Sequence, residues 1–381
     1  MRDVVIVSGA RTPIGRFGGA FKDLSAADLG AAAIRAAVER AGIDPGAVDQ
    51  VIMGNVLQAA DSGYAARKAA LAAGLPESVP ALAVNRACAS GLEAVNLAAH
   101  AVIAGDVEVV VAGGTESMSG APYLAQGVRF GGLRYGNHEL TDALQLGLSC
   151  PIYDYHMGVT AENVAERYEV SREEQDRLAL QSHQRAVAAQ ESGAFDAQIE
   201  PVSVPQARGE PVVVSRDEHP RADTSLERLA ALKPAFKQGG TVTAGNAAGM
   251  NDAAAALVVM SAERAEREGA TPRLRWMGRG VAGVDPAVMG IGPVPATRLA
   301  LERTGLDLGL IDLVELNEAF AAQALYVIRE LGLDEARTNV NGSGISLGHP
   351  LGATGAIMVV KLMEELERRG GRYGLATLCV G

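Results

Sequence analysis

The sequence predicts an α/β protein built from two similar domains with a long insertion between them. Three observations lead to this prediction: apolar strands alternate with helices over residues 1–119, residues 33–53 recur at residues 296–316, and the alternation fades over residues 120–249. Such alternation is typical of a mostly parallel sheet covered by helices on both faces. The length of 381 residues suffices for two or three domains.

The first domain is expected over residues 1–119, with residues 250–270 returning to it through an apolar strand at 251–260. Ser25 can cap a helix that ends at Gly42, and Gly113 with Gly114 is expected to end the last strand. In order, the pattern predicts strands at residues 4–8, 48–54, 79–84 and 107–112, and helices at residues 25–41, 64–73 and 92–104.

Residues 120–249 are expected to form an insertion that carries loops. Glycine, proline and polar residues are frequent there, and helices are predicted at residues 160–168 and 172–192. Ser171 and Glu174 form a capping-box pattern before the second helix. Because binding residues often lie on loops held by a rigid scaffold, this insertion is a plausible place for ligand contacts.

An internal repeat defines the third segment, residues 271–381, as a second copy of the first domain. Residues 33–53 align without gaps to residues 296–316, and ten of the 21 aligned pairs are identical. Both copies are predicted to form a helix, a stop at Gly42 or Gly305, a turn and a strand. A repeat of this kind indicates duplication rather than chance composition.

Cys88 lies between the predicted strand at 79–84 and the predicted helix at 92–104. A helix start lowers the pKa of a thiol, because free N–H groups and the helix dipole favour the thiolate. Small neighbours, Ala87, Ala89, Ser90 and Gly91, allow another molecule to approach the sulfur. Cys88 is therefore a candidate nucleophile, with a buried structural cysteine as the alternative.

The second copy places His349 in the turn that corresponds to Cys88, ahead of a predicted helix at residues 353–369. Ligands in α/β proteins bind at the carboxyl ends of strands, and both turns are predicted to lie there. Two like domains packed about a pseudo-two-fold axis would bring the turns face to face. Alone, His349 reads as a loop histidine bonded to backbone; paired with Cys88, it indicates catalysis.

Two further stretches carry polar or reactive side chains at predicted strand ends. Asn317 follows an apolar strand, and Cys379 and Gly381 end another at residues 375–381. Alternative interpretations are a helix cap for Asn317 and a core residue for Cys379.

Composition excludes several classes of function. A net charge of −11 and an aromatic content of 4% argue against a general nucleic-acid surface. The best apolar run, residues 94–111, is interrupted by polar and charged residues and predicts no membrane span. Three cysteines and six scattered histidines predict neither a disulfide framework nor a metal site, and they fit a reducing, cytoplasmic setting.

Four motifs in this order resemble the thiolase family: Asn85–Gly91 around Cys88, Asn317-Glu318-Ala319-Phe320, Gly348–Gly355 around His349, and Cys379-Val380-Gly381. The resemblance covers residues 1–381. It implies the duplicated thiolase fold, an α/β architecture of five α-β-α-β-α layers with an inserted loop domain. It also implies acyl-CoA substrates, no separate cofactor or metal, and a homotetramer, or a homodimer at least.

The resemblance implies a role for each residue of the motifs. Cys88 would take the acyl group, His349 would activate Cys88 and later bind the thioester oxygen of the second substrate, and Cys379 would move the α-proton. Asn317 would hold a water in the oxyanion hole of His349. The N–H groups of Cys88 and Gly381 would form the other oxyanion hole, where donors stabilise developing negative charge.

Substrate contacts are also implied by the resemblance, which is to short-chain, biosynthetic-type members around residues 155–158. Arg221 would lie near the adenosine phosphate of CoA, and Phe236 and Ala248 near the pantetheine. The acyl pocket would be lined by Leu148, His156, Met157, Met289, Ala319 and Phe320.

The sequence departs from the family at three places. Ala248 stands where serine is usual, and Gly342-Ser343 replaces a Gly-Gly pair. The family continues past Gly381 with a glycine-rich turn and a last strand, so we expect a truncated sequence whose end frays.

The expected activity is the reversible Claisen condensation of two acetyl-CoA to acetoacetyl-CoA and CoA, in lipid metabolism. The near alternative is a broad 3-ketoacyl-CoA thiolase of fatty-acid breakdown. A ketoacyl-ACP synthase, which uses one cysteine and two histidines, would leave Cys379 unexplained. A non-catalytic acyl-CoA-binding protein is the alternative from a different class.

Overall fold

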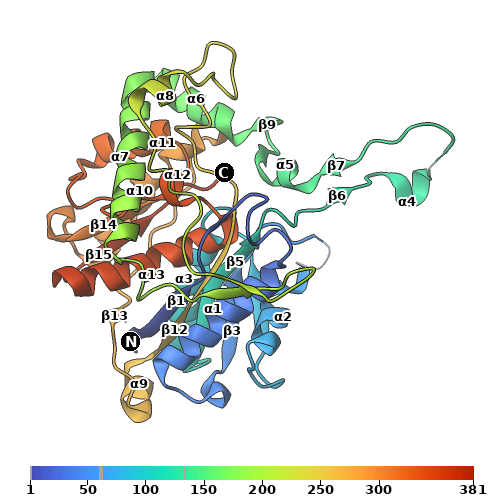
Figure 1. Cartoon of the computed structure of the whole chain (residues 1–381). Coiled ribbons are helices and arrows are strands. Elements are labelled where there is room, and N and C mark those ends of the chain that lie inside the picture. Colours follow the sequence, from blue (N-terminus) through green and yellow to red (C-terminus); the bar gives the residue numbers. More distant parts are fainter. Residues whose placement is uncertain (1, 60–62, 133) are drawn as a thin grey trace.

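The computed structural model describes residues 2–59, 63–132 and 134–381 (Figure 1). Its strands are β1 (Val4–Arg11), β2 (Gly15–Arg16), β3 (Gln50–Gly54), β4 (Ala81–Val84), β5 (Val109–Ser117), β6 (Tyr123–Leu124), β7 (Thr141–Asp142), β8 (Ser149–Cys150), β9 (Tyr155–His156), β10 (Val202–Val204), β11 (Val212–Val214), β12 (Asn251–Ser261), β13 (Leu274–Arg275), β14 (Leu313–Leu316) and β15 (Gly374–Thr377).

Its α-helices are α1 (Ala26–Ala41), α2 (Ala65–Ala72), α3 (Ser90–Ala104), α4 (Val128–Gly131), α5 (Ala143–Gly147), α6 (Met157–Arg167), α7 (Arg172–Glu191), α8 (Leu226–Ala230), α9 (Ala262–Glu268), α10 (Pro293–Thr304), α11 (Ala321–Leu331), α12 (Gly344–Leu347) and α13 (Leu351–Arg369). Short 3₁₀ helices are η1 (Pro45–Ala47), η3 (Pro286–Ile291) and η4 (Leu308–Leu310). The predicted caps at Ser25 and Ser171 are confirmed, since both form capping boxes.

The large sheet has the order β13-β1-β12-β5-β3-β4. β3 is parallel to β4 and β5, whereas β12 is antiparallel to β1 and β5. The prediction of a mostly parallel sheet was therefore wrong; the sheet is mixed. The insertion leaves from the end of β5 and returns to the same edge, where Asp252 pairs with Ser117, so β12 must run back through the sheet.

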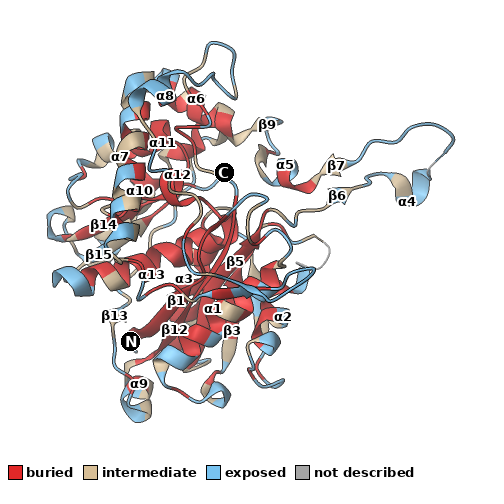
Figure 2. Cartoon of the chain, viewed as in Figure 1, coloured by how far each residue is buried: buried red, intermediate tan, exposed pale blue. Residues whose placement is uncertain are grey.

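The two faces of this sheet are covered by different helices. Alternate residues of a strand point to opposite faces: Ala254, Ala256 and Val258 of β12 pack in the cluster of α1 and α2, and Ala253, Ala255 and Leu257 pack in the cluster of α3 and α13. These faces form the large buried region of the first half (Figure 2).

Helix α13 also packs on the second sheet. Leu362 and Leu366 of α13 contact Leu313 of β14, which is parallel to β15. The far side of β14 is covered by residues of α10 and α11. The layers are thus α1 and α2, the large sheet, α3 and α13, the small sheet, and α10 and α11. This order matches the predicted five layers of the thiolase fold.

Glycines bring the central helices and the sheet into backbone contact. Gly113 and Gly114 lie inside β5, which runs on to Ser117, so the predicted strand end at these residues was wrong. A Cβ on Gly114 would overlap the Gly352 carbonyl oxygen at the start of α13. A Cβ on Gly91 would lie 2.8 Å from the same oxygen. The starts of α3 and α13 therefore touch, which places the Cys88 and His349 turns beside each other.

The apolar character of α3 is explained by this position. Residues 87–104 are long and apolar enough to cross a membrane by length and composition alone, but 56% of that stretch is buried inside the protein. The buried side chains, including Val95, Ala98 and Val102, belong to the core between the large sheet and α13. Core packing thus accounts for the hydropathy.

Candidate active site

The Cys88 turn is held by hydrogen bonds from its neighbours. Asn85 Oδ1 accepts from Ala87 N at 2.9 Å; Ser90 Oγ accepts from Arg86 N at 2.8 Å and donates to Ala87 O at 2.6 Å. Ala87 adopts φ 43°, a left-handed conformation that costs a non-glycine residue about 1–2 kcal/mol. The hydrogen bonds stabilise this unfavourable backbone and fix the cysteine at the start of α3.

The Cys88 thiol lies in mostly apolar surroundings. It packs against two clusters that include Leu57, Met118, Leu351 and Leu378. Burial raises the pKa of Cys88 to about 11, although the N–H groups of Gly381 and of Cys88 itself favour the thiolate. The prediction that the helix start lowers this pKa was therefore wrong for the free protein, because desolvation of the thiolate outweighs the donors.

His349 is buried and neutral. Burial lowers the pKa of His349 to about 4. Thr354 Oγ1 lies 2.7 Å from His349 Nδ1 and donates to the Pro350 carbonyl at 2.9 Å. Because that hydroxyl proton is directed to the carbonyl, His349 Nδ1 must carry the imidazole proton and donate to Thr354. His349 Nε2 is then unprotonated and accepts from Asn317 Nδ2 at 3.3 Å.

Asn317 and Cys379 lie next to these groups. Asn317 is fully buried, and its Oδ1 atom has no hydrogen-bond partner among the described residues. Cys379 is also fully buried, in a cluster with Met289, Ala319 and Phe320. Burial, together with the negative charge that Cys88 would carry, raises the pKa of Cys379. The Gly381 N–H and the Cys379 thiol thus lie close to the Cys88 sulfur, and Asn317 contacts His349 in the turn before α13.

Most of the predicted acyl-pocket residues line one apolar region around Cys379. His156 caps α6 through Nδ1, which accepts from Gly158 N at 3.0 Å, and its ring stacks on Phe236 with centroids 4.8 Å apart. Met157 packs in the same cluster as Met289 and Phe320. The remaining residues connect to this region through backbone bonds: Leu148 O accepts from Met157 N at 2.8 Å, and Ala248 N donates to Ala319 O at 2.9 Å.

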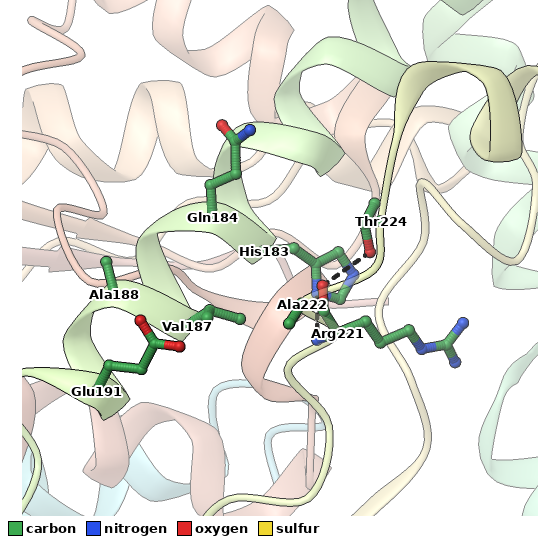
Figure 3. Close-up of a pocket in the computed structure, with 8 residues that line it drawn as sticks. All are labelled: His183, Gln184, Val187, Ala188, Glu191, Arg221, Ala222 and Thr224. Atoms are coloured by element: carbon green, nitrogen blue, oxygen red, sulfur yellow. Dashed lines mark hydrogen bonds between the residues drawn. The ribbon is translucent and has the colours of Figure 1, made fainter.

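Arg221 lies apart from this group. Its side chain extends away from α7, and its backbone N–H donates to His183 Nδ1 at 3.2 Å (Figure 3). It borders a small open pocket formed by α7 and the segment at residues 221–224. Among the described residues, none that lines this pocket belongs to the clusters around Cys88 and Cys379.

Comparison with known proteins decides the family. Residues 4–263 match the model for the thiolase N-terminal domain, and residues 270–381 match that for the thiolase C-terminal domain. The chain belongs to the thiolase family. It is 53% identical to an acetyl-CoA acetyltransferase of Pseudomonas aeruginosa, over 100% of this chain and 97% of that protein. It is 52% identical to the beta-ketothiolase BktB of Cupriavidus necator, over 100% and 96% respectively.

Solved thiolase structures share the fold over the whole chain. The Bacillus anthracis acetyl-CoA acetyltransferase superposes with a TM-score of 0.98 at 50% identity, covering 100% of this chain and 96% of that one. Human mitochondrial 3-ketoacyl-CoA thiolase in complex with CoA superposes with a TM-score of 0.96 at 45% identity, covering 100% and 95%.

Sequence reasoning missed two buried polar residues beside the site of this thiolase. Asn251 Oδ1 accepts from His349 N at 3.1 Å, and Asn251 Nδ2 donates to Gly15 O at 2.9 Å. Glu116 is a fully buried carboxylate at the end of β5. The available signal was a polar residue at the site end of each apolar strand, the same signal that identified Asn317.

Proposed function

We propose that this thiolase is an acetyl-CoA C-acetyltransferase, which condenses two acetyl-CoA to acetoacetyl-CoA and CoA through an acetyl-cysteine. The observation that supports the proposal is the contact between the start of α3, which follows Cys88, and the start of α13, which follows His349, with Cys379 and the Gly381 N–H near the Cys88 sulfur. A non-catalytic acyl-CoA-binding protein would need no second buried thiol beside the first. Similarity to an acetyl-CoA acetyltransferase at 53% identity supports the same activity.

In the first half-reaction, Cys88 attacks the thioester carbonyl of acetyl-CoA. His349 Nε2 accepts the thiol proton, because the Thr354 contact leaves this nitrogen unprotonated. The proton replaces the 3.3 Å contact from Asn317 Nδ2. The N–H groups of Cys88 and Gly381 point at the sulfur and are suited to bind the oxyanion that forms beside it. CoA leaves with the proton from His349, and the acetyl group remains on Cys88.

In the second half-reaction, Cys379 removes an α-proton from a second acetyl-CoA. A negative charge on Cys88 would raise the pKa of Cys379, but neither the resting thiol nor the acetylated Cys88 carries one. Cys379 can therefore act as the base while Cys88 is acetylated. The enolate oxygen is bound by His349 and by a water on Asn317, whose free Oδ1 is a ready acceptor. The carbanion then attacks the acetyl carbonyl, the bond between that carbon and the Cys88 sulfur breaks, and the Cys88 thiolate takes the proton that Cys379 removed.

The acyl pocket favours a short chain. A Cβ on Gly381 would overlap the Met157 sulfur and lie 3.3 Å from Met289 Cγ, so both methionines crowd the space beside the oxyanion donor. Similarity to human mitochondrial 3-ketoacyl-CoA thiolase keeps longer 3-ketoacyl-CoAs as the alternative substrates. Phe236 and Ala248 would contact the pantetheine, and Arg221 the adenosine phosphate.

We further propose a homotetramer, or a dimer at least, that acts in the cytoplasm in lipid metabolism. The segment with β6, α4 and β7 stands away from the rest of the chain (Figure 1) and exposes Phe130 and Tyr135 almost completely. Strand β4 is an edge of the large sheet with Leu82 exposed. Exposed apolar residues and a free edge support association with further copies. Three free cysteines fit a reducing compartment.

The deciding experiment measures acetylation of Cys88. Incubation with acetyl-CoA should add one acetyl group by intact mass, and the addition should be absent in Cys88→Ala. Thiolysis of acetoacetyl-CoA should follow the same dependence. An acetyl group that persists in Cys88→Ala would remove the nucleophile from the proposal. Faster thiolysis of longer 3-ketoacyl-CoAs than of acetoacetyl-CoA would assign the alternative activity.

A further inference from the structure

Glu116 stands between the two halves of the site. Its carboxylate accepts four N–H donors: Asn55 Nδ2 at 2.9 Å, Val56 N at 3.0 Å, Leu57 N at 3.2 Å and Gly352 N at 2.8 Å. Among its described partners every contact is a donor, and none is a cation. An ionised carboxylate can only accept, so these donors favour the charged form, whereas burial raises the pKa of Glu116 to about 7.

Two of these donors, Leu57 N and Gly352 N, lie in or next to residues whose side chains surround the Cys88 thiol. Leu57 and Leu351 pack in the cluster that contains Cys88, and Gly352 follows Leu351 in the first turn of α13. First-turn N–H groups of a helix lack partners within the helix and favour a negative charge. Glu116 thus fastens the start of α13, and with it the His349 turn, to the strands of the first half.

We propose that Glu116 is a positioning residue that fixes the position of the His349 turn relative to Cys88. This inference rests on the proposed function where the test measures kcat. The hydrogen bonds of Glu116 come from the structure alone. The carboxylate also lies close enough to Cys88 for its negative charge to disfavour the Cys88 thiolate. The negative charge of Asp252 in β12, which accepts from Ser119 N at 2.9 Å, also raises the pKa of Glu116.

The proposal separates the effects of the Glu116 charge from those of its geometry. Glu116→Gln removes the charge and turns an N–H group toward donors, so kcat should fall about ten- to hundredfold, with KM little changed because Glu116 lies outside the acyl pocket. Loss of the charge should also move the pH dependence of Cys88 alkylation by iodoacetamide to lower pH. Glu116→Asp keeps the charge but withdraws it from Gly352, so kcat should fall while the alkylation profile stays unchanged.

Asp49→Asn is the matched control. Asp49 accepts from Glu108 N and Val109 N at 2.8 and 2.9 Å, at the opposite end of β5 from Glu116. This variant should keep the kcat and the alkylation profile of the unmodified protein. If Glu116→Gln does not fold, Glu116→Asp carries the test through kcat alone. Unchanged kcat in every folded Glu116 variant would overturn the proposal.

The two proposals fail in different ways. Absence of acetylation in the unmodified protein would reject the acetyltransferase activity but leave the alkylation comparison intact. An alkylation profile in Glu116→Gln that coincides with that of the unmodified protein would reject the placement of the charge against Cys88, whatever the substrate.

Discussion

Cys88 should react slowly with iodoacetamide at neutral pH in the free protein. Burial raises the pKa of its thiol from 9.0 to about 11, which lowers the thiolate fraction at pH 7 about a hundredfold. A more basic thiolate is also more nucleophilic, by about tenfold over this range at a Brønsted slope near 0.5. Together these effects predict alkylation about tenfold slower than that of an unperturbed cysteine at pH 7.

The assay follows intact mass against time at several pH values. Cys88→Ala provides the background from Cys150 and Cys379, which are both buried. The base-10 logarithm of the alkylation rate should rise by about one for each pH unit, and the rate should not level off before about pH 10. His349→Ala should leave this profile in place, because burial keeps the pKa of His349 at about 4 and its imidazole uncharged at neutral pH.

A plateau at or below pH 9 would refute this reasoning. It would mean that the N–H groups of Gly381 and Cys88 outweigh desolvation, so that the thiolate exists before substrate binds. A profile that moves to higher pH in His349→Ala would point to a thiolate–imidazolium pair. If the prediction holds, Cys88 remains a thiol at rest, and it gives its proton to His349 only as it attacks the thioester.

Three further predictions concern other parts of the site. The Cys379→Ser variant should still accept an acetyl group, as measured by intact mass, but it should catalyse condensation very poorly. The reason is that a hydroxyl is a far weaker base near neutral pH than a thiol. Normal condensation in this variant would remove Cys379 from the mechanism. Thiolysis kcat/KM should fall from acetoacetyl-CoA to 3-ketohexanoyl-CoA, and Met157→Ala should soften the fall; a rate that rises by the equivalent of about 0.8 kcal/mol per methylene would indicate an open pocket. The free energy of unfolding should fall from pH 6.5 toward pH 4 by up to about 3 kcal/mol for His349, because its folded pKa of about 4 lies below its unfolded value and the unfolded chain binds the proton first. Burial also lowers the pKa values of His183 and His219 to about 4, so His349→Asn should lessen the fall in urea midpoints over this window without abolishing it. An equally steep loss in that variant would exclude His349.

The sequence was enough to predict the duplicated architecture, because the repeat identified equivalent helix–turn–strand units and the thiolase motifs supplied the layers. It did not reveal the direction of β12. An apolar run such as residues 251–260 fits a parallel or an antiparallel strand equally well, and only the return of the insertion to the edge that it left decides between them. Glycine was misinterpreted for a related reason: Gly113 and Gly114 suggest a strand end locally, but their function is contact with another segment.

The same limit applies to the chemistry of the site. The repeat predicted the approach of the Cys88 and His349 turns, since equivalent turns of paired domains face each other. The pKa of Cys88 depends instead on what surrounds the sulfur, including Leu351 from the second half and the charge of Glu116. A helix start alone would favour a thiolate, whereas a helix start packed against a second domain keeps the half-buried Cys88 as a thiol. Packing α3 on α13 through Gly91 and Gly352 therefore has two consequences: it brings the turn of the base beside the turn of the nucleophile, and it excludes part of the water that would otherwise stabilise the thiolate before the substrate arrives.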